Sequence, residues 1–298
     1  MKRDEFLESG YVPEFIQWLE TKLDKPGTFE HSFYLEKAGK EWRCGCLYEA
    51  FQAYWWPFSL IDPVSGEKVS GEGFEETFAF LTRLAEAFRR SVGEGDVAAT
   101  QQCALAALEW GGALPKNRER ILEMGPRICS YFRDVSHRLD LAKVTLGDHY
   151  DIRSNAGFTK LHFLLVDDLI MYDGRVGAAM GFLLPRFCEE KGLEAVPDSL
   201  RFSFGRDRGD KPGSSKYHRR DPSDGPYRFP EFTGDRWRHL NDNIKASWLL
   251  KAVADSTGSR FKELPQEPLL NKRLTALQSA LFMLGYDVRT GVDSARPA

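Results

Sequence analysis

Apolar residues recur at helical spacing along most of the chain, and this pattern constrains the fold more than any other feature. Six of them mark one face of an amphipathic helix: Phe74, Phe78, Leu81, Leu84, Ala85 and Phe88. Gly93 and Gly95 would end that helix. Alternation with a period of two, which is typical of strands, is scarce. We therefore expect a mainly α protein.

Further helices are predicted at residues 103–110, 117–133, 237–254 and 269–284, and Gly125-Pro126 should break the second of these. Residues 201–230 are rich in Arg, Gly, Pro, Asp and Ser and predict a long loop, which we interpret as an insertion. The expected architecture is a single two-lobed helical domain over residues 1–298. An aromatic-rich helical lobe would occupy residues 1–148, and the lobe with the loop would occupy residues 149–298.

Composition and charge limit the classes of function. With 42% hydrophobic and 29% charged residues, the chain has the composition of a globular protein. Its net charge of -3 gives no argument for a nucleic-acid partner, so any basic surface must come from local clustering. Five scattered cysteines predict free thiols in a reducing compartment, and we expect a cytoplasmic protein: Cys44, Cys46, Cys103, Cys129 and Cys188.

Neither the cysteines nor the six histidines have the spacing of a metal site, so no metal and no cofactor are expected. No stretch approaches the roughly 18 uninterrupted apolar residues of a membrane-spanning helix. Aromatic residues crowd the segment 42–58. An amphipathic helix that delivers core residues is the favoured interpretation, and a base-stacking platform is the other. In the second case Tyr54, Trp55 and Trp56 would form a base pocket.

The segment 153–180 carries the most informative local pattern. Asn155 or Thr159 can cap a short helix that ends at Asp167-Asp168. An apolar link over residues 169–172 then leads to Asp173, and the apolar spacing that follows predicts a longer helix. Asp173 should therefore lie at a helix N-terminus, where a carboxylate is stabilised.

This order of parts resembles the helix-hairpin-helix DNA glycosylase superfamily, and within it bacterial proteins related to the oxoguanine glycosylases. Residues 171–176, Met-Tyr-Asp-Gly-Arg-Val, are similar to the sequence around that superfamily's catalytic Asp. Residues 159–161, Thr-Lys-Leu, are similar to its Lys-bearing helix start. The family hairpin usually has the form Gly-x-Gly, whereas only Gly157 is present here, and the 13 positions from Lys160 to Asp173 are fewer than usual.

The resemblance implies that Lys160 is the amine nucleophile and that Asp173 is the carboxylate beside the sugar. Breaking an N-glycosidic bond builds positive charge on the sugar, which a carboxylate stabilises. An amine that attacks C1′ forms a Schiff base, and strand cleavage by elimination can follow. The partner would be double-stranded DNA with the target nucleotide flipped out of the stack.

Local charge supports a DNA partner. Residues 201–260 contain 13 Lys or Arg against 8 Asp or Glu, a surplus of five positive charges. Arg238, Asn241 and Lys245 fall on one face of the predicted helix over residues 237–254, where a solvated face would give the same pattern. The predicted DNA-contacting residues are Asn155, Gly157, Thr159, Arg175, Arg219, Arg220, Arg238, Asn241 and Lys245.

Two other functions stay open. The fold could serve as a non-catalytic sensor of DNA or of a modified base in a repair or phage-defence system. It could also be a helical interaction protein, whose loop at residues 201–230 binds a protein; its protein partners are unknown. The base excised, the oligomeric state and the source of phosphate anchoring do not follow from the sequence.

Overall fold

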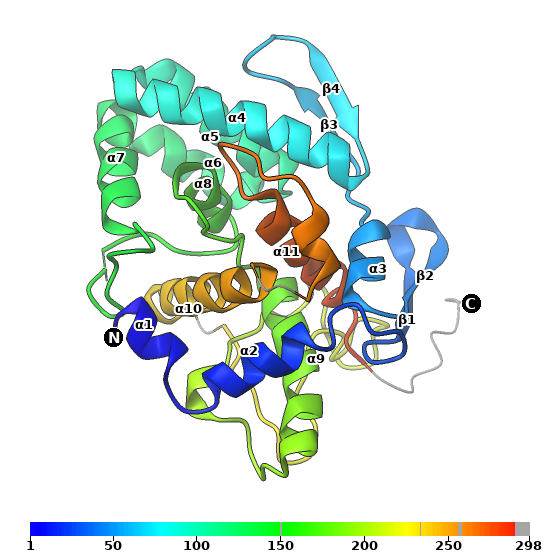
Figure 1. Cartoon of the computed structure of the whole chain (residues 1–298). Coiled ribbons are helices and arrows are strands. Elements are labelled where there is room, and N and C mark those ends of the chain that lie inside the picture. Colours follow the sequence, from blue (N-terminus) through cyan, green and yellow to red (C-terminus); the bar gives the residue numbers. More distant parts are fainter. Residues whose placement is uncertain (150, 233, 256–257, 290–298) are drawn as a thin grey trace.

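The computed structural model describes residues 1–149, 151–232, 234–255 and 258–289. In these ranges the chain is mainly helical, as predicted, with two small antiparallel hairpins (Figure 1). The N-terminal half contains α1 (Arg3–Leu7), α2 (Val12–Glu20), β1 (His31–Leu35), β2 (Lys40–Cys44), α3 (Leu47–Gln52), β3 (Phe58–Ile61), β4 (Lys68–Gly71), α4 (Phe74–Glu94), α5 (Val97–Trp110), α6 (Leu114–Glu123) and α7 (Ile128–Arg138). The C-terminal half contains α8 (Phe158–Leu165), α9 (Gly174–Lys191), α10 (Arg236–Ala254) and α11 (Lys272–Leu284).

The helix boundaries follow local chemistry. Gly95 adopts a positive φ of 77° and ends α4, as the sequence indicated. Asp96 caps α5, which therefore begins earlier than the predicted residue 103. A 3-10 turn over Gly125–Arg127 separates α6 from α7, because Pro126 cannot continue the hydrogen bonding of a helix.

The aromatic segment is only partly helical. Residues 47–52 form α3 and place Tyr48 and Phe51 in the core, whereas Tyr54, Trp55 and Trp56 lie in the connection to β3. The hairpin β1–β2, which the sequence did not reveal, pairs His31 with Cys44 and Leu35 with Lys40.

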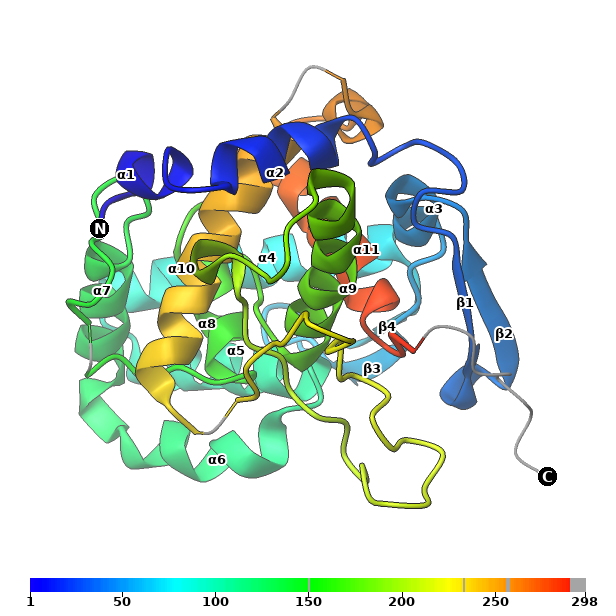
Figure 2. The same cartoon turned by 90° about the horizontal axis from the view of Figure 1, so that it is seen from below.

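Buried hydrophobic side chains form one continuous cluster that extends from Phe6 to Val288. All eight residues of α8 are buried in this cluster. Helices α4, α5 and α7 pack against α8, while α11 packs against α3, α9 and α10. Viewed from below, α9, α10 and α11 cross the middle of the molecule, and α2 covers one side of them (Figure 2). A helix buried on all sides holds its side chains in fixed positions, so α8 is a rigid platform.

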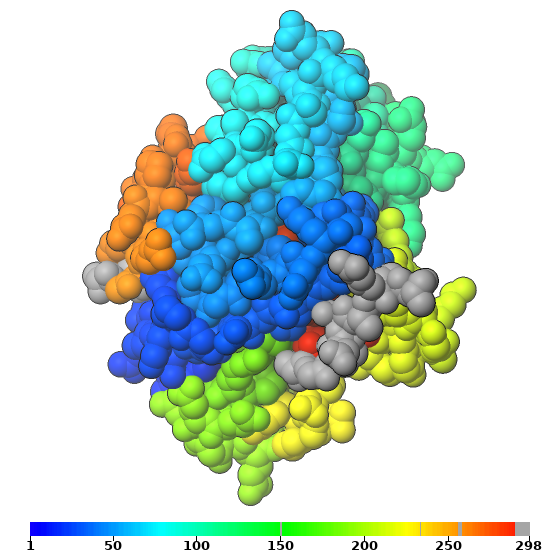
Figure 3. Space-filling model, turned by 90° about the vertical axis from the view of Figure 1, so that its right-hand side faces the viewer, coloured from blue at the N-terminus to red at the C-terminus, as the bar shows by residue number. Residues whose placement is uncertain are grey.

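Residues 201–230 form a loop without named helices or strands, as predicted. Its basic part is held by Arg219, which is buried and forms ion pairs with Glu36, Asp207 and Asp287. The loop extends beside α9 in Figure 2, and Figure 3 shows it next to the N-terminal segments, which cover the middle of that face. The division into two lobes stays a prediction.

Candidate functional site

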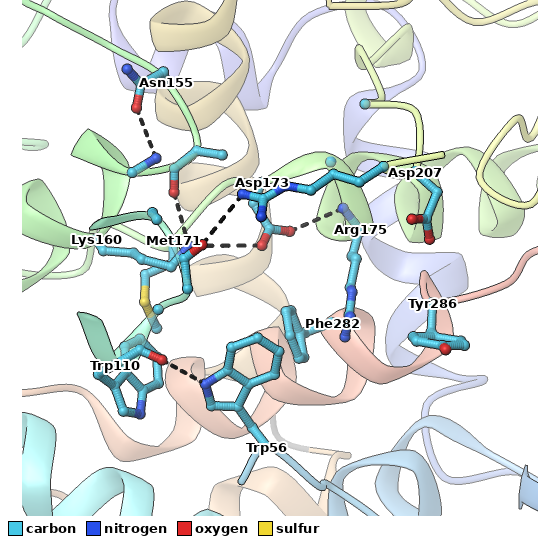
Figure 4. A pocket seen from close by; sticks show the side chains of 18 of the residues that line it. Trp56, Trp110, Asn155, Lys160, Met171, Asp173, Arg175, Asp207, Phe282 and Tyr286 are labelled. Carbon is cyan, nitrogen blue, oxygen red and sulfur yellow. Dashed lines mark hydrogen bonds and ion pairs between the residues drawn. The ribbon is translucent and has the colours of Figure 1, made fainter. Parts of the chain in front are cut away.

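A cavity of about 1000 Å³ opens where α5, α6, α8, α9, α11 and the loop meet. Figure 4 shows Lys160 and Asp173 directed toward each other at its centre, with Trp56 and Phe282 on one wall. A volume of this size accommodates a nucleotide-sized ligand. Segments far apart in the sequence therefore contribute to one site.

Lys160 lies in the first turn of α8 and is only 7% exposed. Asn155 positions this helix start, because its Oδ1 accepts hydrogen bonds from the backbone N–H groups of Gly157 and Phe158. The Nζ of Lys160 donates to the carbonyl of Ala156 at 2.8 Å. Its aliphatic chain lies on Gly111, where an added Cβ would stand 2.2 Å from Cδ and 2.3 Å from Cε. The chain thus has room only because residue 111 lacks a side chain.

Asp173 caps α9, as the sequence predicted. Its Oδ1 accepts from the backbone N–H groups of Arg175 and Val176, at 3.0 and 3.2 Å. The second oxygen, Oδ2, lies 3.8 Å from the Nζ of Lys160. One carboxylate therefore fixes the helix start and faces the amine at the same time.

The buried link before Asp173 has its backbone donors satisfied by side chains from three helices. The N–H of Ile170 donates to Ser247 of α10, that of Met171 to Gln278 of α11, and that of Tyr172 to Thr159 of α8. Because a buried N–H without a partner is costly, these bonds select one path for the link. This path places Asp173 opposite Lys160.

Burial lowers the pKa of Lys160 below its ordinary value of 10.5. The neighbouring positive charges of Arg175 and Arg208 act in the same direction, while Asp173 opposes them. Desolvation disfavours the ammonium form, so a neutral amine is more accessible here than on a surface lysine. A lysine in this state can act as a nucleophile.

An aromatic wall faces Lys160 and Asp173. The guanidinium of Arg175 stands 4.3 Å from the ring centroid of Phe282, 4.8 Å from that of Tyr286 and 5.6 Å from that of Trp56. The indole N–H of Trp56 donates to the carbonyl of Trp110 at 2.9 Å and so fixes its ring. The Arg175 guanidinium therefore covers one face of the Phe282 ring, and the rings and the cation together form an apolar wall that carries one positive charge.

The cavity is strongly cationic in a chain whose net charge is -3. Ten Lys or Arg and four Asp or Glu line it, which leaves a surplus of six positive charges. Among the described residues, four cations at the cavity have no ion pair with a carboxylate and are exposed: Lys37, Lys116, Arg120 and Arg208. Such a rim favours an anionic ligand.

The structure brings some predicted site residues into the cavity and leaves others out. Tyr54 and Trp56 line it, whereas Trp55 donates to Glu72 and lies outside. Thr159 is fully buried and accepts hydrogen bonds from Tyr172 and Asn243, so it has no surface for DNA in this conformation. The remaining predicted residues that line the cavity are Asn155, Gly157, Arg175, Arg219 and Arg220.

Arg219 and Arg220 both form ion pairs with Asp207, which weakens the attraction of their charges for an anionic ligand. The three polar residues of α10 lie outside the cavity. Arg238 donates to Ser203, Asn241 accepts from the backbone of Gly147, and Lys245 pairs with Asp242. Their partners explain the polar stripe without a nucleic acid.

Sequence reasoning missed the contribution of α11. Gln278, Ser279 and Phe282 lie on one face of this helix and line the cavity. The i, i+4 spacing of Gln278 and Phe282 was the available signal, because it places a polar and an aromatic group side by side. Within the described residues no group of three or more His, Cys, Asp or Glu could hold a metal ion. No described helix is long and apolar enough to cross a membrane.

Comparisons with family models, with curated proteins and with solved structures found no match.

Proposed function

We propose that the protein is a DNA glycosylase with abasic-site lyase activity, in which Lys160 is the nucleophile and Asp173 stabilises the sugar cation. The observation that supports this most is the separation of 3.8 Å between the Nζ of Lys160 and the Oδ2 of Asp173 inside a cationic cavity. A buried amine and a carboxylate at this distance can both reach one sugar carbon. The separation also agrees with the roles that the resemblance to helix-hairpin-helix glycosylases implies.

In the first step the bond between C1′ and the base breaks, and its electron pair leaves with the base, which takes up a proton. Positive charge develops on the sugar, and the carboxylate of Asp173 stabilises it electrostatically. The hydrogen bonds from the backbone of Arg175 and Val176 hold this carboxylate in place before the reaction begins. No reorganisation is then needed in the transition state.

In the second step the lone pair of the neutral Lys160 amine forms a bond to C1′. The nitrogen loses one proton, the sugar ring opens as its oxygen takes up a proton, and a protonated Schiff base remains. Loss of a proton from C2′ then expels the 3′ phosphate and cleaves the strand. The lowered pKa of Lys160 supports this step, because only the neutral amine has a lone pair to donate.

The walls suit a flipped nucleotide. Stacking on Trp56 would offset part of the unstacking cost, which is a few kcal/mol per flipped base. The exposed cations Lys37, Lys116 and Arg208 at the rim would contact the phosphates on either side.

Borohydride trapping on a duplex with one abasic site tests the proposal. The hydride reduces the Schiff base to a stable amine, so the wild-type protein should form a covalent adduct. Lys160→Met should abolish the adduct, because methionine keeps the apolar chain over Gly111 without the amine. Lys143→Met is the control, since Lys143 is exposed on the surface and should leave the adduct unchanged.

An absence of trapping by the wild-type protein would contradict lyase chemistry. Binding to DNA that weakens steeply with salt, without trapping, would favour the non-catalytic sensor instead. Binding that salt hardly changes would argue against a DNA role altogether.

A further inference from the structure

The guanidinium of Arg175 contacts three aromatic rings, but it has no ion pair within the part of the chain that the structure describes. Among the described residues its guanidinium forms no ion pair and no side-chain hydrogen bond, although it lines the cavity. The two carboxylates whose charges act on Arg175 are engaged elsewhere, since Asp173 faces Lys160 and Asp207 pairs with Arg219 and Arg220. The charge is therefore left for a ligand.

The guanidinium stays charged at neutral pH. Burial, and next the charge of Arg220, lower the pKa of Arg175 to about 10, which still leaves it protonated. An arginine side chain has five N–H donors and no acceptor. Its hydrogen bonds to a ligand can therefore go only to groups that accept them.

Gln278 adds a donor on the same wall. Its Oε1 accepts from the backbone N–H of Met171 at 2.7 Å, and because that partner can only donate, the amide orientation is fixed. The Nε2 group is then the end left for a ligand, and Gln278 and Phe282 lie one turn apart on α11. Arg175 is stacked on that same Phe282 ring. The edge of a planar ligand on this wall would therefore face the N–H donors of Arg175 and Gln278.

We infer that this wall selects bases whose exposed edge carries carbonyl oxygens, and that the substrates are the mispaired products of deamination, such as uracil and hypoxanthine. This inference rests on the proposed glycosylase function. Deamination replaces an exocyclic amino group, which is a donor, by a carbonyl oxygen, which is an acceptor. The amino groups of cytosine and adenine would instead face the donors of Arg175 and Gln278, and unpaired donors are costly to bury.

Thymine and guanine also have carbonyl oxygens, but we do not expect them to be substrates. They are correctly paired in a duplex, whereas uracil and hypoxanthine arise opposite the former partners of cytosine and adenine. A mispaired base costs less to extrude. The hydrogen-bond donors of the wall and the low cost of extruding a mispaired base thus both favour uracil and hypoxanthine.

The test compares bases that differ only at the amino or carbonyl group and that are all mispaired. Uracil and cytosine are each placed opposite thymine, and hypoxanthine and adenine are each placed opposite guanine. Binding is measured by fluorescence anisotropy and base release on the same duplexes. The wild-type protein should bind and process the carbonyl member of each pair roughly 10- to 100-fold better.

Arg175→Met should remove this preference, measured as the ratio of the affinities for the two members of each pair of duplexes. Methionine keeps an unbranched apolar chain against Phe282. Arg186→Met is the matched control, since Arg186 also lies on α9 and stacks on Phe182 at 4.0 Å, but lies outside the cavity. This control should keep the wild-type preference.

Three results would overturn the inference: a wild-type protein without preference in binding, an Arg175→Met variant that keeps it, or an Arg175→Met variant that weakens all duplexes equally. The last would make Arg175 a phosphate contact. Failure of trapping at the abasic site contradicts the proposed function instead, and the binding preference still tests the role of Arg175 in that case.

Discussion

Two buried histidines should make the fold sensitive to mild acid. His162 of α8 is fully buried and His239 of α10 is 5% exposed. Burial lowers the pKa of His162 to about 3 and that of His239 to about 4, from an ordinary value of 6.5. Both are therefore neutral in the folded protein at pH 5, while both take up a proton in the unfolded chain.

The change in the free energy of unfolding with pH follows from this difference in pKa between the folded and unfolded states. The stabilising contribution is complete above pH 6.5 and is lost as the pH falls from 6.5 toward the folded values. Between pH 7 and pH 5 the unfolded chain gains about 0.7 proton at each histidine, which lowers the free energy of unfolding by about 2 kcal/mol per residue. The pair together contributes about 4 kcal/mol, a large part of the 5–15 kcal/mol that is typical of a domain.

The substitution His162→Leu isolates half of the effect. Among the described residues the ring nitrogens of His162 have no hydrogen-bond partner, so leucine removes the titrating group without breaking a bond. Urea unfolding at pH 7 and pH 5, followed by circular dichroism, should show that the variant loses about 2 kcal/mol less than the wild-type protein. His137→Leu is the control, because His137 is exposed on α7. Equal losses in wild type and His162→Leu would refute the reasoning.

Two further predictions concern the cavity walls. Gly111→Ala keeps an allowed backbone, with φ of −80°, but its Cβ would meet the chain of Lys160 at 2.2 Å, so abasic-site trapping at pH 7 should fall about tenfold. Gly93→Ala, which has open space around it, should leave trapping unchanged, and equal rates in all three proteins would contradict this role of Gly111. Arg219→Met should cost about 1–3 kcal/mol in urea unfolding and speed tryptic cleavage within residues 205–220, because Glu36, Asp207 and Asp287 each lose one of their two cationic partners. Unchanged cleavage would show that the loop is held by other contacts.

Much of the helical architecture could be read from the sequence because its signals are local. The apolar face of α4, the break before α7 and the cap at Asp173 each depend on residues within a few positions of one another. The hairpin β1–β2 was missed because its alternating pattern covers only five residues per strand.

The site was harder to predict because it depends on long-range packing. The resemblance singled out Lys160 and Asp173, and the structure places them 3.8 Å apart, although their roles stay predictions. The sequence around Thr159 did not reveal that its hydroxyl accepts a hydrogen bond from the backbone of Tyr172, in the link before Asp173. No local signal connects α8 to Gln278 or Phe282, which lie more than a hundred residues further along the chain.

The hydrogen bonds to the link before Asp173 also set the order in which the protein can mature during synthesis. The acceptors for Ile170 and Met171 are Ser247 and Gln278, which are translated long after the link itself. Until α11 has left the ribosome, the backbone N–H of Met171 lacks its acceptor, so this bond cannot yet fix the path of the link toward Lys160. The geometry between Lys160 and Asp173 is therefore complete only after α11 has been synthesised and has packed against the link.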